Sequence, residues 1–120
     1  MKSKILEVCP VLPSQNIERD AEWYKNHVGF EVLHQDKMYA VIKRDELCLH
    51  LQWHADNDDD PLLGGSVIRI IVDNLMPIFD ELVERGTVKK EKLTLNTAWG
   101  TNEFGFFDLN KNAVFIVQRV

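Results

Sequence analysis

The feature that most constrains this chain is an internal repeat built around two helices. Asn16 can cap a helix in which apolar residues recur at spacings of three and four, and Gly29 can end it. Asp73 or Asn74 and Gly86 offer the same signals again, with Asp73 and Gly86 each 57 positions later (73 − 16 and 86 − 29). The chain is therefore predicted to be a structural duplication.

Short runs rich in β-branched and aromatic residues surround each predicted helix. The runs lie at 5–12, 30–35, 38–44 and 47–53 in the first half, and at 66–72, 88–92, 102–107 and 113–118 in the second. Each half is therefore predicted to contain a strand, a helix and three further strands. In such a unit the helix covers one face of a mixed sheet and leaves the other face concave. We expect an α+β fold of two tandem βαβββ modules whose sheets form a cleft.

Length and charge limit the possible organisation and partners. With 120 residues, 45% of them hydrophobic, the chain can bury one core but not two independent cores. We expect one domain over 1–120, with module 1 at about 1–54, an acidic connector at about 55–65 and module 2 at about 66–120. The net charge of −5 argues against nucleic acid and membrane surfaces as partners. Without a membrane-length apolar run or a signal-peptide pattern, a cytoplasmic location is expected.

Two segments resemble the signature segments of bleomycin-resistance proteins, which belong to the vicinal-oxygen-chelate superfamily together with glyoxalase I and extradiol dioxygenases. They read PVLPSQNIERDAEWYKNHVGFEV near the N-terminus and WGTNEFGFFDLNKNAVFIV near the C-terminus. The resemblance implies the glyoxalase/bleomycin-resistance fold and a function in antibiotic resistance by sequestration, without chemistry. It also implies a homodimer with shared clefts, often with the N-terminal strand exchanged between subunits.

Catalytic members of this superfamily hold a divalent metal with side chains from the first and last strands of each module. When the helix caps are aligned, these positions fall on Cys9, His50, Val67 and Phe115. Val67 and Phe115 have no donor atom, and the other two residues are fewer than the three protein ligands that catalytic zinc usually has. We therefore expect no metal, no cofactor and no catalytic residue.

Two alternatives remain open. A metal-dependent glyoxalase- or dioxygenase-type enzyme would need a shifted set of donors, such as Glu46, His50, His54 and Glu103. The same scaffold could also serve a different small molecule, since function is carried by the site and not by the fold.

The resemblance further implies where a ligand binds. Trp99 matches a tryptophan that stacks on the flat tail of the drug, and Tyr39 matches an aromatic, typically Phe in the family, on the other side of that stack. In a dimer these two rings would come from different chains. The alternatives are that Trp99 anchors its loop on its own sheet and that Tyr39 reflects only β-propensity.

Strand alternation adds further candidates on the same face. His50 falls on the more polar face of its strand, either as a ligand-binding group or as a polar residue beside a cavity, and Arg69 needs a partner such as Glu103. Trp53 either lines the rim or covers the core. For a small, planar, partly cationic drug-like ligand, the predicted binding residues are Tyr39, His50, Trp53, Arg69, Trp99, Glu103 and Phe115.

The cysteines and the acidic run have simpler interpretations. Cys9 and Cys48 lie in apolar segments without a metal-ligand spacing, so we expect buried free thiols. The acidic run at 56–60 is predicted to be a solvated connector, with attraction of a cationic ligand as the alternative.

Overall fold

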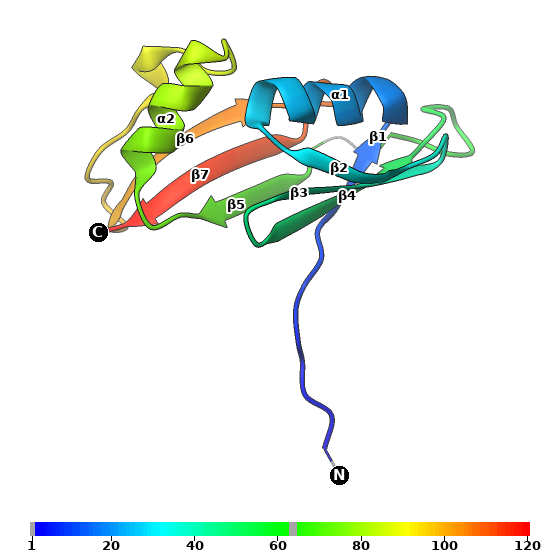
Figure 1. Ribbon diagram of the computed structural model, residues 1–120, viewed down its shortest axis with the longest axis horizontal. Coiled ribbons are helices and arrows are strands. Elements are labelled where there is room, and N and C mark those ends of the chain that lie inside the picture. Colours follow the sequence, from blue (N-terminus) through cyan, green and yellow to red (C-terminus); the bar gives the residue numbers. More distant parts are fainter. Residues whose placement is uncertain (1, 63–64) are drawn as a thin grey trace.

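The computed structural model describes residues 2–62 and 65–120, and Figure 1 shows its two modules. The elements are β1 (Val11–Ser14), α1 (Ile17–Val28), β2 (Glu31–Gln35), β3 (Tyr39–Arg44), β4 (Leu47–Trp53), β5 (Val67–Ile71), α2 (Leu75–Glu84), the 3₁₀ helix η1 (Lys90–Lys92), β6 (Thr101–Phe107) and β7 (Ala113–Arg119). The first sheet has the order β1-β4-β3-β2 and the second β5-β7-β6. In both sheets the first strand runs parallel to the last and the other pairs are antiparallel. The predicted α+β duplication with mixed sheets is confirmed.

Local signals explain where α1 begins and ends. The side chain of Asn16 accepts a hydrogen bond from the backbone N–H of Arg19 at 3.0 Å, which caps the first turn. Gly29 ends the helix with φ of 75°, in the left-handed region that favours glycine. The buried residues of α1 are Ile17, Asp20, Ala21, Tyr24 and Val28.

The N-terminus of α2 is capped by a distant strand. Asn74 occupies the N-cap position without a side-chain hydrogen bond to the helix. Instead, the side chain of Gln118 on β7 accepts from the backbone N–H of Leu75 at 2.8 Å. The start of the helix was predicted from the sequence, but the group that satisfies its first turn comes from 43 residues away in the chain.

The first strand is shorter than predicted. The run at 5–12 was expected to be a strand, but β1 begins at Val11. Val11 pairs with His50, so each β1 residue faces a β4 residue 39 positions later (50 − 11). At that offset, residues before Val8 pass the start of β4 at Leu47 and have no strand to pair with. The N-terminal segment therefore extends away from the body (Figure 1), with Ile5 88% exposed.

The second module has one strand fewer than predicted. The run at 88–92 was expected to be a strand, but residues Lys90–Lys92 form η1 instead. Val88, four positions after the end of α2, is buried, and the following Lys-Lys-Glu-Lys segment is exposed, so this run has no alternating apolar face to dock on a sheet. The chain reaches the edge of β6 only later, through an isolated bridge between Thr94 and Glu103.

Part of the acidic connector is folded. The backbone N–H groups of Asp59 and Asp60 donate to the side chain of Asn57, and the carboxylate of Asp60 accepts from the backbone N–H of Ala55. Residues 63 and 64 of the predicted connector lie outside the described residues.

Buried carboxylates join the two modules. Asp108, which follows β6, accepts hydrogen bonds from the hydroxyl of Tyr24 on α1 at 2.7 Å and from the side-chain amide of Asn112 at 2.8 Å. Its other oxygen accepts from the backbone N–H groups of Asn110 and Asn112. Burial and the neighbouring carboxylate raise the pKa of Tyr24 far above its usual value, so the hydroxyl stays a donor.

Asp20 on α1 forms the second half of this connection. It accepts hydrogen bonds from the hydroxyl of Ser14, from Nε of Arg19 and from the side-chain amide of Asn110, the last at 2.7 Å. Asp20 and Asn110 are 1% and 5% exposed. The turn between β6 and β7 is thereby fixed against α1.

This network predicts unequal costs for its members. Asp108→Ala leaves four donors without an acceptor and should lower the free energy of unfolding by about 3–5 kcal/mol, whereas Tyr24→Phe removes one donor and should cost about 1–2 kcal/mol. Urea denaturation followed by circular dichroism measures both, with the exposed Lys25→Ala as the control. Equal, small losses for the two variants would contradict this interpretation of the network.

Candidate functional site

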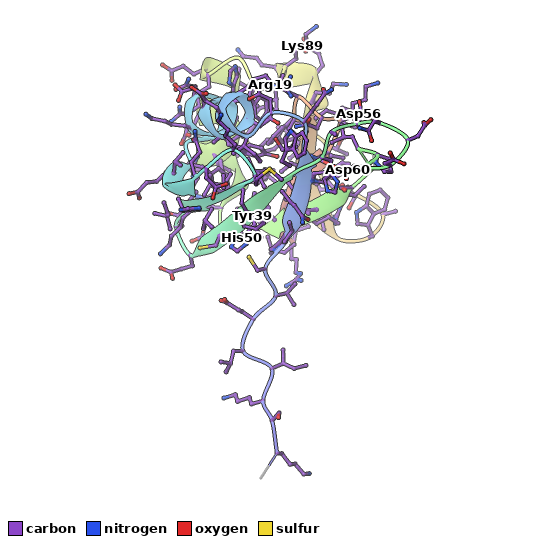
Figure 2. The ribbon with its side chains drawn as sticks, turned by 90° about the vertical axis from the view of Figure 1, so that its right-hand side faces the viewer. Arg19, Tyr39, His50, Asp56, Asp60 and Lys89 are labelled. Atoms are coloured by element: carbon purple, nitrogen blue, oxygen red, sulfur yellow. The ribbon has the colours of Figure 1, made fainter. Side chains whose placement is uncertain are left out.

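The face of the first sheet opposite α1 carries Tyr39 and His50. Along β4, Leu49 and Leu51 are buried in the core, so His50 between them points to the opposite face. The hydroxyl of Tyr39 on β3 lies 2.6 Å from Nδ1 of His50, and the rings meet edge to face with centroids 5.3 Å apart. Figure 2 shows both residues at the lower surface of the sheet, near the point where the N-terminal segment leaves the body. The predicted position of His50 on the polar face is confirmed.

Glu103 organises the corresponding face of the second sheet. Its carboxylate accepts hydrogen bonds from Nη2 of Arg69 at 2.7 Å, from the hydroxyl of Thr101 at 2.7 Å and from the indole N–H of Trp99 at 3.2 Å. The predicted pairing of Arg69 with Glu103 is therefore observed. Hydrogen bonds from Arg69, Thr101 and Trp99 lower the pKa of Glu103 to about 2, so the carboxylate is charged at neutral pH.

Phe115 provides the apolar part of this face. Its ring lies directly over Gly105, where an added Cβ would come within 2.7 Å of the ring atoms. The guanidinium of Arg69 lies 5.6 Å from the ring centroid, a cation–π geometry. Trp99 is 68% exposed although Glu103 holds its N–H. The face thus combines a fixed ion pair with aromatic surface that remains available for contact.

The two clusters occupy corresponding places in the duplication. His50 lies on the last strand of module 1 and Phe115 on the last strand of module 2. Tyr39 lies opposite Gln52, two positions after His50. In the same way, Glu103 lies opposite Val117, two positions after Phe115. Equivalent strand positions therefore carry a hydroxyl–imidazole pair in module 1, and a carboxylate beside an aromatic ring in module 2.

Trp53 lies apart from both clusters. It shares the strand face of Leu51, packs against the core and donates its indole N–H to the backbone carbonyl of Gln15 at 3.0 Å. Of the two possibilities left open by the sequence, the structure supports covering the core.

A groove of about 460 Å³ lies between the modules, lined mainly by apolar side chains that include Leu49, Ile68 and Ile70. Among the predicted binding residues, only Arg69 lines it. The groove therefore does not join the Tyr39–His50 pair to the cluster around Glu103. Among the described residues, no hydrogen bond or ring contact connects these two groups.

The aligned metal positions are not assembled into a donor set. Over residues 2–62 and 65–120, no group of three or more His, Cys, Asp or Glu side chains is placed to hold a metal ion. Of the shifted donors, His54 forms a hydrogen bond with Asp60 in the connector, and Glu103 forms one with Arg69. That the protein binds no metal stays a prediction.

None of the helices within residues 2–62 and 65–120 is long and apolar enough to span a membrane.

Two residues of the cluster around Glu103, Thr101 and Gly105, were not predicted from the sequence. Thr101 lies two positions before Glu103 on one strand, a spacing that places both on one face, and this signal was available. Gly105 inside a strand was the other available signal, because glycine there often marks a close approach by another group.

The predicted burial of Cys9 and Cys48 is wrong. They were expected to be buried, but Cys9 is exposed and Cys48 is half-buried.

Known proteins share this architecture. The chain is 21% identical to bleomycin resistance proteins of Geobacillus stearothermophilus and Staphylococcus aureus over 130 positions, covering 97% of this chain and 98% of each relative. A bleomycin resistance determinant encoded on transposon Tn5 superposes with a TM-score of 0.80 at 20% identity, over 96% of this chain and 98% of that chain. A bleomycin-binding protein complexed with bleomycin has a TM-score of 0.78 at 18% identity, over 97% of this chain and 100% of that chain. No family model matches the sequence.

The paired mixed sheets are the glyoxalase/bleomycin-resistance fold. A glyoxalase/bleomycin resistance protein/dioxygenase from Nocardioides has the same fold, with a TM-score of 0.77 at 12% identity over 100% of this chain and 87% of that chain. Over nearly its whole length, the chain is also similar in sequence to the bleomycin resistance proteins. The resemblance predicted from the two sequence segments is confirmed.

The ion pair at Glu103 predicts a defined pH dependence. Its pKa of about 2 in the folded state lies below the ordinary 4.5, so the carboxylate stabilises the fold fully above about pH 4.5 and loses this contribution as the pH falls towards 2. Because Glu103→Gln cannot titrate, the difference in unfolding free energy between wild type and variant should shrink over that range. Urea denaturation at several pH values measures this difference.

A direct titration checks the cause. The carboxyl ¹³C shift of Glu103 should have its midpoint near pH 2 in the wild type, and Arg69→Met should move this midpoint upward because the main hydrogen-bond donor is lost. A wild-type midpoint near 4.5 would show that the carboxylate is not held by these partners.

Proposed function

We propose that this protein binds a small, planar, drug-like molecule on the open faces of its sheets and acts by sequestration, without chemistry. The observation that carries the proposal is the exposed indole of Trp99, whose N–H is fixed by Glu103 on the open face of the second sheet. An exposed aromatic ring held in one orientation costs little further entropy when a flat ligand stacks on it. The full-length similarity to bleomycin resistance proteins supports a bleomycin-type glycopeptide as the first ligand to test.

The polar groups on both faces suit ligand binding better than catalysis. Donors from Arg69, Thr101 and Trp99 hold Glu103 as a charged acceptor. The Tyr39 hydroxyl and the His50 ring bond each other, and among the described residues no third side chain orients the imidazole as a catalytic base would require. These groups can instead orient a ligand through hydrogen bonds while the aromatic rings supply contact area.

We further propose that the functional unit is a homodimer with shared clefts. Each chain holds the Tyr39–His50 pair and the Glu103 cluster on separate sheets, without a hydrogen bond between them among the described residues, and a second chain would bring one of each around a shared ligand. The N-terminal segment exposes Ile5, Leu6 and Val8, and β5 is an edge strand in its sheet. Pairing of the segment with a second copy would bury these apolar groups and give the edge a partner.

Substitutions of the aromatic residues test the ligand site. Trp99→Ala should weaken bleomycin binding about 10- to 100-fold because the stacking surface is lost, and Tyr39→Ala should weaken it as well. Isothermal titration calorimetry measures the dissociation constants, with Trp53→Phe as a matched control whose affinity should be unchanged.

Two results would redirect the assignment. No saturable binding of bleomycin or phleomycin would remove the drug, and a thermal-shift screen of other planar compounds would then test the same faces, since native-state ligands raise the apparent Tm. Stoichiometric zinc, nickel, manganese or iron in gently purified protein would contradict binding without chemistry and favour the enzyme.

The dimer has its own test. Sedimentation velocity should show a dimer for the full chain and a monomer for a variant lacking residues 2–8, because the exposed apolar segment is removed. The truncated variant should also bind bleomycin more weakly if the cleft is shared. A truncated chain that remains dimeric with full affinity would contradict the role of the segment.

A further inference from the structure

The structure brings together two cysteines that are far apart in the chain. The parallel register pairs Val11 with His50 and Leu12 with Leu51, an offset of 39 positions. The backbone N–H of His50 also donates to the carbonyl of Pro10 at 3.0 Å, so the chain still lies against β4 one residue before β1 begins. Extending the same offset by two positions places Cys9 beside Cys48 (48 − 9), where the N-terminal segment leaves the sheet.

Contacts between the two residues agree with this register. The thiol of Cys9 donates to the backbone carbonyl of Cys48 with a sulfur–oxygen distance of 3.9 Å. Cys48 has the same strand parity as His50, so its side chain points to the open face of the first sheet. Neighbouring strands lie about 4.8 Å apart, within the Cα separation of roughly 4.4–6.8 Å that a disulfide spans.

Accessibility favours reaction at this pair. Cys9 is exposed and Cys48 is half-buried, so a small reagent can reach the first thiol while the second lies behind it. Desolvation and the neighbouring Cys48 and Glu7 raise the pKa of the Cys9 thiol, which keeps it protonated at neutral pH. The Cys9 thiol therefore reacts slowly at neutral pH, and its oxidation is faster in mildly alkaline buffer.

We propose that Cys9 and Cys48 form an oxidisable pair whose disulfide fixes the root of the N-terminal segment to the first sheet. A low-molecular-weight disulfide such as oxidised glutathione is the oxidant. The Cys9 thiolate attacks it, breaks its sulfur–sulfur bond and releases one glutathione thiolate, leaving Cys9 in a mixed disulfide. The Cys48 thiolate then attacks Sγ of Cys9 and releases the second glutathione thiolate. Two thiols are oxidised to one disulfide, and one glutathione disulfide is reduced to two thiols.

The location gives the disulfide two consequences. It closes the loop from Cys9 to Cys48 and thus holds β1 against β4, where β1 is an edge strand only four residues long. It also lies two positions along β4 from His50, on the face that carries Tyr39. Oxidation would therefore set both the path of the N-terminal segment and the shape of this open face. Disulfides in reducing compartments are usually transient and redox-sensing, which suits such a pair.

Oxidation of the full-length protein tests the proposal. After incubation with oxidised glutathione at about pH 8.5 and alkylation of the remaining thiols, intact mass spectrometry should show the loss of two hydrogens and no alkylated cysteine. Trypsin should release a cross-linked pair of peptides, residues 5–19 with residues 45–69. The apparent Tm should rise by about 5 °C and return to its starting value with dithiothreitol.

Single variants separate a specific pair from general thiol reactivity. Cys48→Ser should stop at a mixed disulfide on Cys9, and Cys9→Ser should form no internal cross-link; neither should show the rise in Tm. Two glutathiones on the wild type, two unreacted thiols, or a covalent dimer on a non-reducing gel would each overturn the proposal. None of these measurements involves a ligand, so they are independent of the proposed binding function.

Discussion

The carboxylate of Asp108 is the interaction on which the arrangement of the two modules depends. It collects donors from α1 and from the β6–β7 turn, and Asp20 repeats this role from the helix side through Asn110. A buried carboxylate is tolerated only when donors surround it, so this connection has one geometry. It joins α1 to the second module. Both helices lie on one side of the strands (Figure 1), which leaves the opposite faces of both sheets free of helices.

On those free faces the duplication has diverged. The same structural position holds the Tyr39–His50 pair in one module and the Glu103 cluster in the other. The core-facing side chains on the same strands are mainly apolar in both modules, among them Ile42, Leu49, Phe104 and Ile116. Packing constrains the covered faces strongly, because a change of volume is costly there, whereas the open faces can change with the ligand. A binding protein and a metal enzyme can therefore share this fold with different residues at equivalent positions.

The differences between prediction and structure have one physical origin. A strand forms only where a neighbouring strand exchanges backbone hydrogen bonds with it. The β-propensity of a run does not show where that neighbouring strand begins or ends. The run at 5–12 loses its first part because β4 begins at Leu47, and the run at 88–92 is a 3₁₀ helix because its exposed Lys-Lys-Glu-Lys segment offers no face to bury. The contact between Cys9 and Cys48 was missed for the same reason, since it depends on the register of β1 with β4.

By itself, the sequence determined the duplication, both helices, most strands and the parity that places His50 and Arg69 on open faces. These features follow from local capping and from periodicity, which act over a few residues. Only the tertiary structure decided which side chains meet: Arg69, Thr101 and Trp99 around Glu103, Trp53 on the core, and the two thiols at the root of the N-terminal segment. Such contacts depend on strand register and chain crossing, which the whole fold sets.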